Sequence, residues 1–236
     1  MVQKSPMQAA ATKGCERTVR ALPGTHKLVV ATALRHAGPG RRALDLGAGS
    51  GALAERLQDA GFRVIAADID KYFELGSEFH QIDLNDPTFD RRFDPGFDVI
   101  TSVEVIEHLE NPTAFLRSIE RLLKPNGVAI LTTPNVENVA ARIKYFLRGE
   151  IRAMDRTAPD HITPIHFDLF VRQVIPRTGL TLVEHFAHPK GDFPLTGRRY
   201  FVPLFWLVLP FVKGPARTGD SNVFVLKKAS TASARC

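Results

Sequence analysis

Cysteine is scarce in this chain: the 236 residues contain two, Cys15 and Cys236, near opposite ends of the sequence. Neither a disulfide framework nor a thiolate metal site is therefore expected, and a reducing cytoplasm fits this composition. Residues 1–20 also lack the apolar stretch of a secretory signal peptide. We expect a disordered N-terminal tail over 1–20 and a short C-terminal tail over 229–236.

A membrane-spanning run is missing even where the chain is most apolar, because two prolines interrupt the short stretch 200–212. Two interpretations of this stretch stay open. It can form a helix packed over the mouth of an active site. It can also form an interfacial anchor with basic flanks at Arg198, Arg199 and Lys213, which would give a peripheral membrane contact through about 198–213.

The overall composition is that of an ordinary folded domain, with 44% hydrophobic and 24% charged residues. The length suits one α/β domain with additions. A formal net charge of +6 and a pI near 9.5 favour acidic partners such as a nucleic acid, an anionic membrane face or a charged substrate. Because no basic run is interleaved with aromatic residues, a nucleic acid is the less favoured of these.

The stretch Ala43–Gly51 is the most informative part of the sequence. Apolar residues surround Asp45 and lead into three glycines at alternate positions, Gly47, Gly49 and Gly51, and a helical pattern follows from Ala52. This order predicts a buried strand, a tight turn and a helix N-terminus, against which a nucleotide-like ligand can lie on bare backbone.

Two classes of cofactor use such a turn. Gly47, Gly49 and Ala52 also satisfy the dinucleotide fingerprint G-x-G-x-x-G/A, in which an anionic pyrophosphate sits at the helix N-terminus. S-adenosylmethionine carries no phosphate but has an ammonium and a sulfonium group. Asp45 would attract such a cation and repel a pyrophosphate, so the sequence favours S-adenosylmethionine over NAD.

Strand and helix patterns alternate along the rest of the chain. Their short connections predict a parallel sheet covered by helices. Thr25 is expected to cap the first helix, which ends near Gly38. The expected strands are 42–46, 62–67, 79–82, 97–101, 128–132, 180–186 and 222–227, and the other expected helices are 52–60, 113–123, 136–147 and 167–177.

Acidic and imidazole side chains follow the second and fourth strands. Asp68 directly follows the apolar residues of the second strand, where a carboxylate can accept hydrogen bonds from a ribose diol; Asp70 is better suited to capping a helix. Glu104, Glu107 and His108 stand at i, i+3 and i+4 and share one face if the backbone turns helically. Oxygen and imidazole ligands suit Mg²⁺ or Mn²⁺.

A second interpretation of these side chains needs no metal. An imidazole whose pKa lies near neutrality can take a proton from an attacking hydroxyl, so His108 can act as a general base or as a neutral orienting group. Glu104 and His108 are the expected catalytic residues.

The string Ala43–Gly51 resembles motif I of class I methyltransferases, and Ile82-Asp83-Leu84 resembles the adenine motif of that family. Thr133-Pro134-Asn135, Phe146–Gly149 and Asp160-His161-Ile162 resemble UbiG-like methyltransferases, and the likeness covers about residues 40–187. It implies a Rossmann-like, seven-stranded, mostly parallel sheet with helices on both faces and an antiparallel C-terminal hairpin. The implied domain spans 21–228, with an insertion at about 188–221.

The resemblance also implies a cofactor, a metal and the residues that hold them. The sequence E-x-x-E-H is similar to that of metal-dependent O-methyltransferases, both the ubiquinone-biosynthesis type and the small-RNA 3′-terminal 2′-O type. Those enzymes supply a further histidine, for which His161 is preferred here and His166 is the alternative. The implied S-adenosylmethionine site comprises Asp45, Gly47, Ala48, Gly49, Gly51, Asp68, Ile69, Asp83, Leu84 and Val103.

The expected function is O-methylation of a hydroxyl on a small-molecule, glycan or lipid-linked acceptor, in the cytoplasm or at the inner face of the membrane. A 3′-terminal 2′-O-methyltransferase of RNA is the first alternative. An NAD-dependent dehydrogenase and a catalytically silent cofactor-binding module stay open as others.

Overall fold

The computed structural model of the chain describes residues 21–38, 41–70, 78–189 and 202–230. The expected N-terminal tail, most of the expected C-terminal tail, both cysteines and the basic pair Arg198–Arg199 lie outside the described residues.

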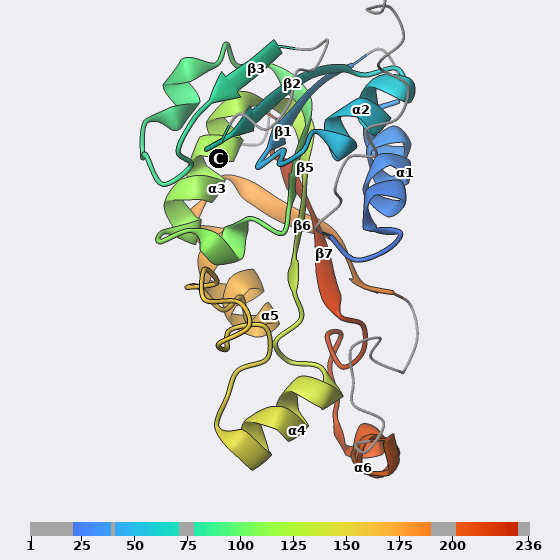
Figure 1. Ribbon diagram of the computed structural model, residues 1–236. Coiled ribbons are helices and arrows are strands. Elements are labelled where there is room, and N and C mark those ends of the chain that lie inside the picture. Colours follow the sequence, from blue (N-terminus) through green and yellow to red (C-terminus); the bar gives the residue numbers. More distant parts are fainter. Residues whose placement is uncertain (1–20, 39–40, 71–77, 190–201, 231–236) are drawn as a thin grey trace, which may run out of the picture.

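A seven-stranded sheet forms the centre of the molecule (Figure 1). Its strand order is β3-β2-β1-β4-β5-β7-β6; the first five strands are parallel, and β7 runs antiparallel to both of its neighbours. The expected Rossmann-like arrangement with a closing antiparallel hairpin is confirmed. The strands are β1 (Arg42–Leu46), β2 (Arg63–Asp68), β3 (Glu78–Gln81), β4 (Phe97–Val103), β5 (Leu123–Pro134), β6 (Leu180–His188) and β7 (Ser221–Lys228).

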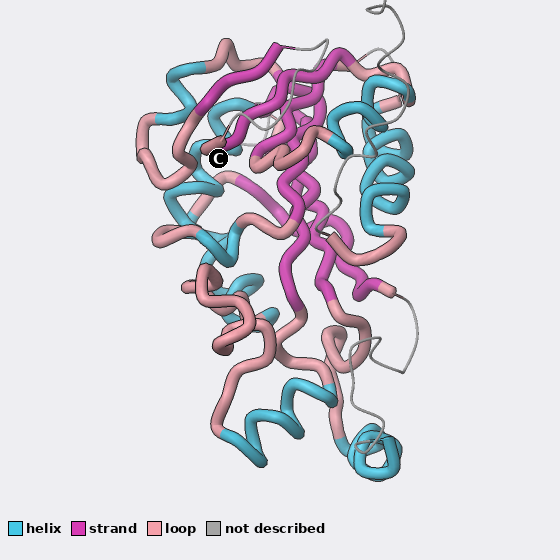
Figure 2. The backbone as a smooth tube through the Cα atoms, in the orientation of Figure 1, coloured by secondary structure: helices cyan, strands magenta, loops and turns pink. Residues whose placement is uncertain are grey.

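Helices cover both faces of the sheet, because the central strands are apolar on both sides. Side chains alternate along β5: Ile130 belongs to the core beneath one pair of helices, and Leu131 to the core on the other face. The first core is covered by α1 (Thr25–Ala37) and α2 (Ala52–Asp59), and the second by α3 (Pro112–Leu122) and the helical segment 167–177. Figure 2 shows this layering along the backbone.

The segment 167–177 is helical as expected but irregular. It begins as α5 (Phe167–Leu169), continues as a π-turn and ends as a 3-10 turn at Arg177. Pro176 lacks the N–H that a regular α-helix would need at that position, which agrees with the tightened last turn. The segment still contributes Phe170 and Ile175 to the core.

Three element boundaries differ from the sequence-based expectation. Gly24, with φ of +86°, stands at the N-cap of α1, so Thr25 is its buried first residue and not its cap. The strand expected at 128–132 begins earlier, at Leu123. Its pairing with β4 shifts register between Phe97 and Val99, so the residues between Leu123 and Val128 bulge out of the ladder. The helix expected from Val136 starts only after Asn138, whose side-chain oxygen accepts from the N–H of Ala141 at 2.8 Å.

Two further helices lie together at one end of the molecule, beyond the carboxyl end of β5 (Figure 1). They are α4 (Val139–Arg148) and α6 (Val202–Val208), which continues as a 3-10 turn through Phe211. Val139 and Ile143 pack there against Leu209 and Val212 in a small separate core. Among the described residues, no helix has the length and apolar character to cross a bilayer.

Candidate functional site

A cavity of about 650 Å³ opens at the carboxyl ends of β1, β2 and β4. This edge is where ligands bind in open α/β sheets. Most of the residues expected from the sequence to form a site line it: Asp45, Gly47, Ala48, Gly49, Asp68, Ile69, Asp83, Leu84, Val103, Glu104, His108 and His161. Of the other expected residues, Gly51, Glu107 and His166 do not line it.

The glycine turn closes one side of this cavity. The N–H groups of Gly47 and Ala48 both donate to the carbonyl of Ala67, at 2.8 and 3.0 Å, which fixes the turn to the end of β2. Gly47 has φ of +78°, and a Cβ there would lie 2.2 Å from Cγ2 of Val105. Nothing lies within 4 Å of a Cβ placed on Gly49, so the space beside that residue is open to a ligand.

Asp45 is the most unusual carboxyl group of the cavity. Only 1% of the residue is exposed, one carboxylate oxygen accepts from the hydroxyl of Thr101 at 2.8 Å, and the other has no partner among the described residues. Burial raises the pKa of Asp45 to about 7; the Thr101 hydrogen bond opposes this change, and the charge of Asp68 adds to it. A cation in the cavity would stabilise the charged carboxylate and so offset the free-energy cost of its burial.

Asp68 is hydrogen-bonded within the site itself. Its Oδ2 accepts from the N–H of Gly49 at 2.7 Å, and its Oδ1 accepts from the N–H of Asp70 at 3.2 Å. The carboxylate therefore ties the glycine turn to the end of β2. Because each carboxylate oxygen can accept more than one hydrogen bond, Asp68 keeps capacity for a ribose, and that role stays a prediction.

The loop after β3 carries the residues expected near an adenine. One carboxylate oxygen of Asp83 accepts from the N–H of Asn85 at 2.8 Å. The side-chain oxygen of Asn85 accepts from the N–H of Glu110 at 2.9 Å. Asn85, which the sequence did not single out, therefore holds this side of the cavity against the segment after β4.

Glu104 stands directly after β4 in the left-handed region, with φ of +54°. A non-glycine residue in that region costs about 1 kcal/mol and is found most often where function requires it. Its Oε1 accepts from the hydroxyls of Thr132 at 2.8 Å and Ser221 at 3.1 Å. Burial raises the pKa of Glu104, and those two hydroxyls and the imidazole of His161 oppose that change.

Glu107 lies beside His108 and His161, and the two histidines line the other side of the cavity. One potential ligand atom from each lies within 4.8 Å of the others. Backbone hydrogen bonds hold the two segments together: the carbonyl of Glu107 accepts from the N–H groups of Ile162 and Thr163, both at 2.9 Å. The loop bearing His161 is thereby fastened beside the 3-10 turn Ile106–His108.

The hydrogen bonds of the two imidazoles indicate where their protons lie. Nδ1 of His108 lies 3.0 Å from the carbonyl of Asp160, and Nδ1 of His161 lies 2.6 Å from the carbonyl of Ala153. A carbonyl only accepts, so both Nδ1 atoms carry hydrogen, and each neutral ring has its lone pair on Nε2. The two rings meet edge to face with their centroids 4.5 Å apart.

Glu107 is fully buried, and within the described part of the chain neither of its carboxylate oxygens has a partner in good hydrogen-bond geometry. Burial raises the pKa of Glu107 well above its ordinary value, and the charge of Glu104 adds to this, while its own backbone and the Thr133 hydroxyl oppose the change. A buried carboxylate without a partner is unfavourable unless a cation compensates it. Held histidines beside such a carboxylate form a donor set that fits a divalent metal ion.

The structure separates the two histidines proposed as the additional ligand. His161 belongs to the group just described, whereas Nδ1 of His166 lies 3.5 Å from a carboxylate oxygen of Glu137 and outside that group. Glu104 also lies outside the closest group, although its charge acts on Glu107.

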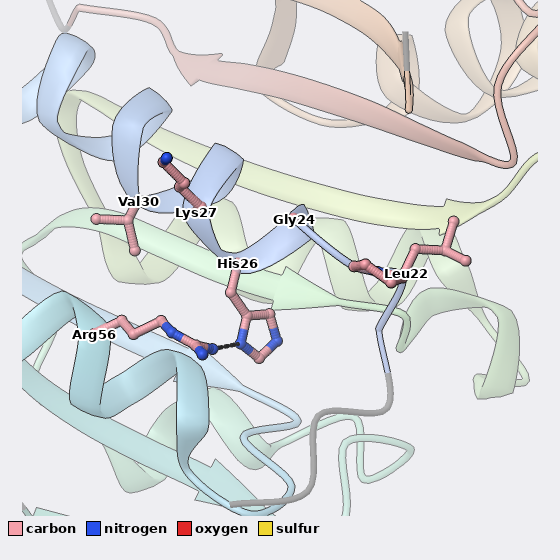
Figure 3. Close-up of a pocket in the computed structure, with 7 residues that line it drawn as sticks. Leu22, Gly24, His26, Lys27, Val30 and Arg56 are labelled. Carbon is pink, nitrogen blue, oxygen red and sulfur yellow. Dashed lines mark hydrogen bonds between the residues drawn. The ribbon is translucent and has the colours of Figure 1, made fainter. Parts of the chain in front are cut away.

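A second cavity of about 560 Å³ lies between α1 and α2 (Figure 3). The guanidinium of Arg56 donates to Nδ1 of His26 at 2.7 Å. Burial, with the charge of Arg56, lowers the pKa of His26 to about 4, so this imidazole is neutral near pH 7. His26 also lines the main cavity. No motif marked it in the sequence, because it comes from a helix outside the strand–turn–helix pattern.

One interpretation placed the apolar stretch 200–212 over the mouth of the main cavity. Of the residues in 203–213 whose side chains the structure describes, none lines that cavity, and α6 packs on α4. The packing of α6 on α4 joins segments that are far apart in the sequence, and the apolar pattern of 200–212 alone did not predict it.

Comparison with known proteins gives one family match and many fold matches. A family model described as a methyltransferase domain matches residues 19–185. The ubiquinone biosynthesis O-methyltransferase of Ruegeria pomeroyi is 35% identical over 104 residues, which cover 41% of this chain and 42% of that protein. The corresponding protein of Xanthomonas campestris strain B100 is 34% identical over 113 residues, covering 44% and 47%. The chain therefore spans less than half the length of these relatives.

Two solved structures illustrate the likeness in fold. A SAM-dependent methyltransferase from Archaeoglobus fulgidus superposes with a TM-score of 0.57 at 18% identity, covering 86% of this chain and 95% of that chain. The 1,6-didemethyltoxoflavin-N1-methyltransferase of Burkholderia thailandensis, solved with S-adenosylhomocysteine, gives a TM-score of 0.57 at 16% identity, covering 87% and 78%. At these identities the likeness concerns the fold alone.

Proposed function

Because the chain belongs to the methyltransferase domain family, we propose that it transfers the methyl group of S-adenosylmethionine to a hydroxyl of a small-molecule, glycan or lipid-linked acceptor. One observation carries this proposal: a single cavity has acidic groups and the glycine turn at one side, and His108 and His161 at the other. The first side suits a cationic nucleoside, and the second suits the deprotonation of an acceptor.

We propose that Asp45 takes the ammonium group of the donor. Its unpartnered, buried oxygen and raised pKa support this role, since an ammonium would supply the missing partner and restore the charged form. Asp68 would accept from the ribose and Asp83 from the adenine amino group. A pyrophosphate would meet the same carboxylates with like charge, which disfavours the NAD alternative.

Methyl transfer is an in-line displacement. The acceptor oxygen forms a bond to the methyl carbon while the carbon–sulfur bond breaks and its electron pair returns to sulfur. The hydroxyl proton goes to Nε2 of His108, whose lone pair is directed away from the carbonyl of Asp160. The cavity contributes by aligning the two reactants and excluding water.

Glu107, His108 and His161 would also hold Mg²⁺ or Mn²⁺, with Glu104 contributing charge nearby. Such an ion lowers the pKa of a bound hydroxyl. If the ion is bound through Nε2 of His108, another group must take the proton. The metal and the general-base roles of His108 are therefore alternatives that a chelator separates.

The test is incubation of the purified protein with methyl-labelled S-adenosylmethionine and an extract of the source cells, with and without EDTA. We expect label in the lipid or small-molecule fraction. Label in RNA alone would replace this acceptor class by the RNA alternative, which the net charge of +6 favours. No transfer to any fraction would contradict the proposal. A cytoplasmic location, at the inner membrane face for a lipid-linked acceptor, is part of the proposal.

A further inference from the structure

Two helices at one end of the molecule expose large apolar side chains. On α4, Phe146 is 87% exposed, and on the turn after α6, Phe211 is 81% exposed. Tyr145, Leu147, Trp206 and Leu207 are each exposed by more than half. We call these six residues the apolar tip. Scattered exposed apolar residues are ordinary, but six of them on two helical segments that contact each other indicate an interaction surface.

The two helices are held together by a small core of their own, made of other residues than the apolar tip. Val139 and Ile143 of α4 already pack against Leu209 and Val212. Phe146 continues the same i, i+4, i+7 stripe of α4, yet it is almost fully exposed. The apolar stripe of α4 therefore extends beyond what α6 covers, and its last turn presents apolar side chains to the surroundings.

The charged side chains on the two helical segments that form the apolar tip are all basic, and the nearest acidic residue after α4, Glu150, is paired with Lys144. Arg142 and Arg148 of α4 and Lys213 after α6 are exposed, and neither 139–148 nor 202–213 contains an acidic residue. Lys144 is different, because it is paired with Asp155 and Glu150. Basic residues flanking exposed aromatic and aliphatic side chains are the pattern of a surface that binds at the headgroup region of anionic bilayers.

The apolar tip also lies beyond the carboxyl end of β5, the strand that supports the part of the cavity proposed for the acceptor. The strand β5 carries Thr132, which hydrogen-bonds Glu104 in the cavity wall, and α4 follows soon after the end of that strand. Figure 1 shows α4 and α6 beyond this end of the sheet. A protein docked by this end has the carboxyl end of β5 directed toward the membrane, the side from which a lipid-linked acceptor arrives.

We propose that the apolar tip docks the protein on an anionic bilayer, with Phe146 and Phe211 inserting at the interface and Arg142, Arg148 and Lys213 contacting the headgroups. The proposal rests on the lipid-linked form of the proposed acceptor. It extends the membrane contact expected at 198–213 to α4, which supplies half of the surface. The contact proposed is peripheral, with the two helices at the interface.

The experiment uses the chain's single tryptophan, Trp206, which belongs to the apolar tip. Vesicles of phosphatidylcholine with about a third phosphatidylglycerol should shift its emission to the blue and co-sediment the protein, while pure phosphatidylcholine should do so weakly. The double variant F146S/F211S should lose at least about tenfold in vesicle affinity. The matched control Leu169→Ser, at another exposed leucine, should retain wild-type affinity.

Binding of S-adenosylmethionine by the same variants, measured by calorimetry, separates this inference from the proposed function. We expect it to be unchanged in F146S/F211S, which also shows that the variant is folded. Failure of wild-type protein to bind the anionic vesicles would overturn the inference while leaving methyl transfer untouched. Concentration-dependent dimerisation abolished by F146S/F211S, without vesicle binding, would overturn it in favour of a second copy of this chain as the occupant.

Discussion

Replacing Asp45 by asparagine should stabilise the folded protein above neutral pH and weaken the binding of the methyl donor. Burial raises the pKa of Asp45 from its ordinary value of 3.8 to about 7 in the folded chain. Between these values the folded state holds a proton that the unfolded state releases. The stability that this group contributes is therefore complete below about pH 4 and is lost as the pH rises through 7.

The size of this stability difference follows from the difference between the two pKa values of Asp45. At 1.36 kcal/mol per pKa unit, charging Asp45 in the folded protein costs on the order of 4 kcal/mol at pH 8. Asparagine stays neutral and can keep the hydrogen bond from Thr101. The stability of D45N relative to the wild type should therefore increase by up to that amount between pH 4 and pH 8.

Urea unfolding at several pH values measures this difference, and calorimetry measures donor binding. The wild type should bind S-adenosylmethionine more weakly below pH 7, as Asp45 becomes protonated, and D45N should bind weakly throughout. The control is Asp98→Asn. Burial alone would raise the pKa of Asp98, but hydrogen bonds from Lys124 and the backbone of Arg42 lower it. Asp98→Asn should thus lose stability above about pH 4 and keep donor binding.

Two results would refute this reasoning. The first is a stability difference between D45N and the wild type that does not change from pH 5 to pH 8. The second is undiminished donor binding by D45N, which would remove Asp45 from the ammonium site.

Three further predictions test other parts of the site. Gly47→Ala should lower the free energy of unfolding by about 1–3 kcal/mol in urea, because the new Cβ meets Val105 in a left-handed backbone. The Cβ of Gly49→Ala meets no atom, so this control should lose less stability. Equal losses for the two variants would contradict this explanation. His108→Ala should lower turnover about 10²–10⁴-fold in a labelled-methyl assay while calorimetry shows donor binding retained, and unchanged turnover would remove His108 from the mechanism. Glu107→Gln should abolish Mn²⁺ binding measured by electron paramagnetic resonance and raise the unfolding temperature, because it replaces a buried carboxylate without a partner; retained Mn²⁺ binding would exclude Glu107 as a ligand.

Local patterns in the sequence predicted the sheet and the residues on the glycine-turn side of the cavity. The alternation of apolar strands and amphipathic helices requires no long-range information, and the glycines at 47 and 49 are needed by the turn itself. Asp45 and Asp68 follow from their places at the ends of two adjacent parallel strands, which must meet at one edge of the sheet. All of these residues line the cavity.

Contacts between distant segments were beyond the same reasoning. The sequence preferred His161 but kept His166 as an alternative, because the loop that carries them is placed by two hydrogen bonds to the carbonyl of Glu107, which no local pattern predicts. It contained no sign of the left-handed backbone at Glu104, which hydroxyls from β5 and β7 support. It missed His26, which enters the cavity from α1.

Binding of S-adenosylmethionine to the purified chain, measured by titration calorimetry beside NAD, tests the central claim most directly. We predict one equivalent of S-adenosylmethionine bound per chain, weaker binding by Asp68→Ala, and no binding of NAD. Uptake of NAD in place of S-adenosylmethionine, or no uptake of either, would contradict the assignment of the cavity to a methyl donor.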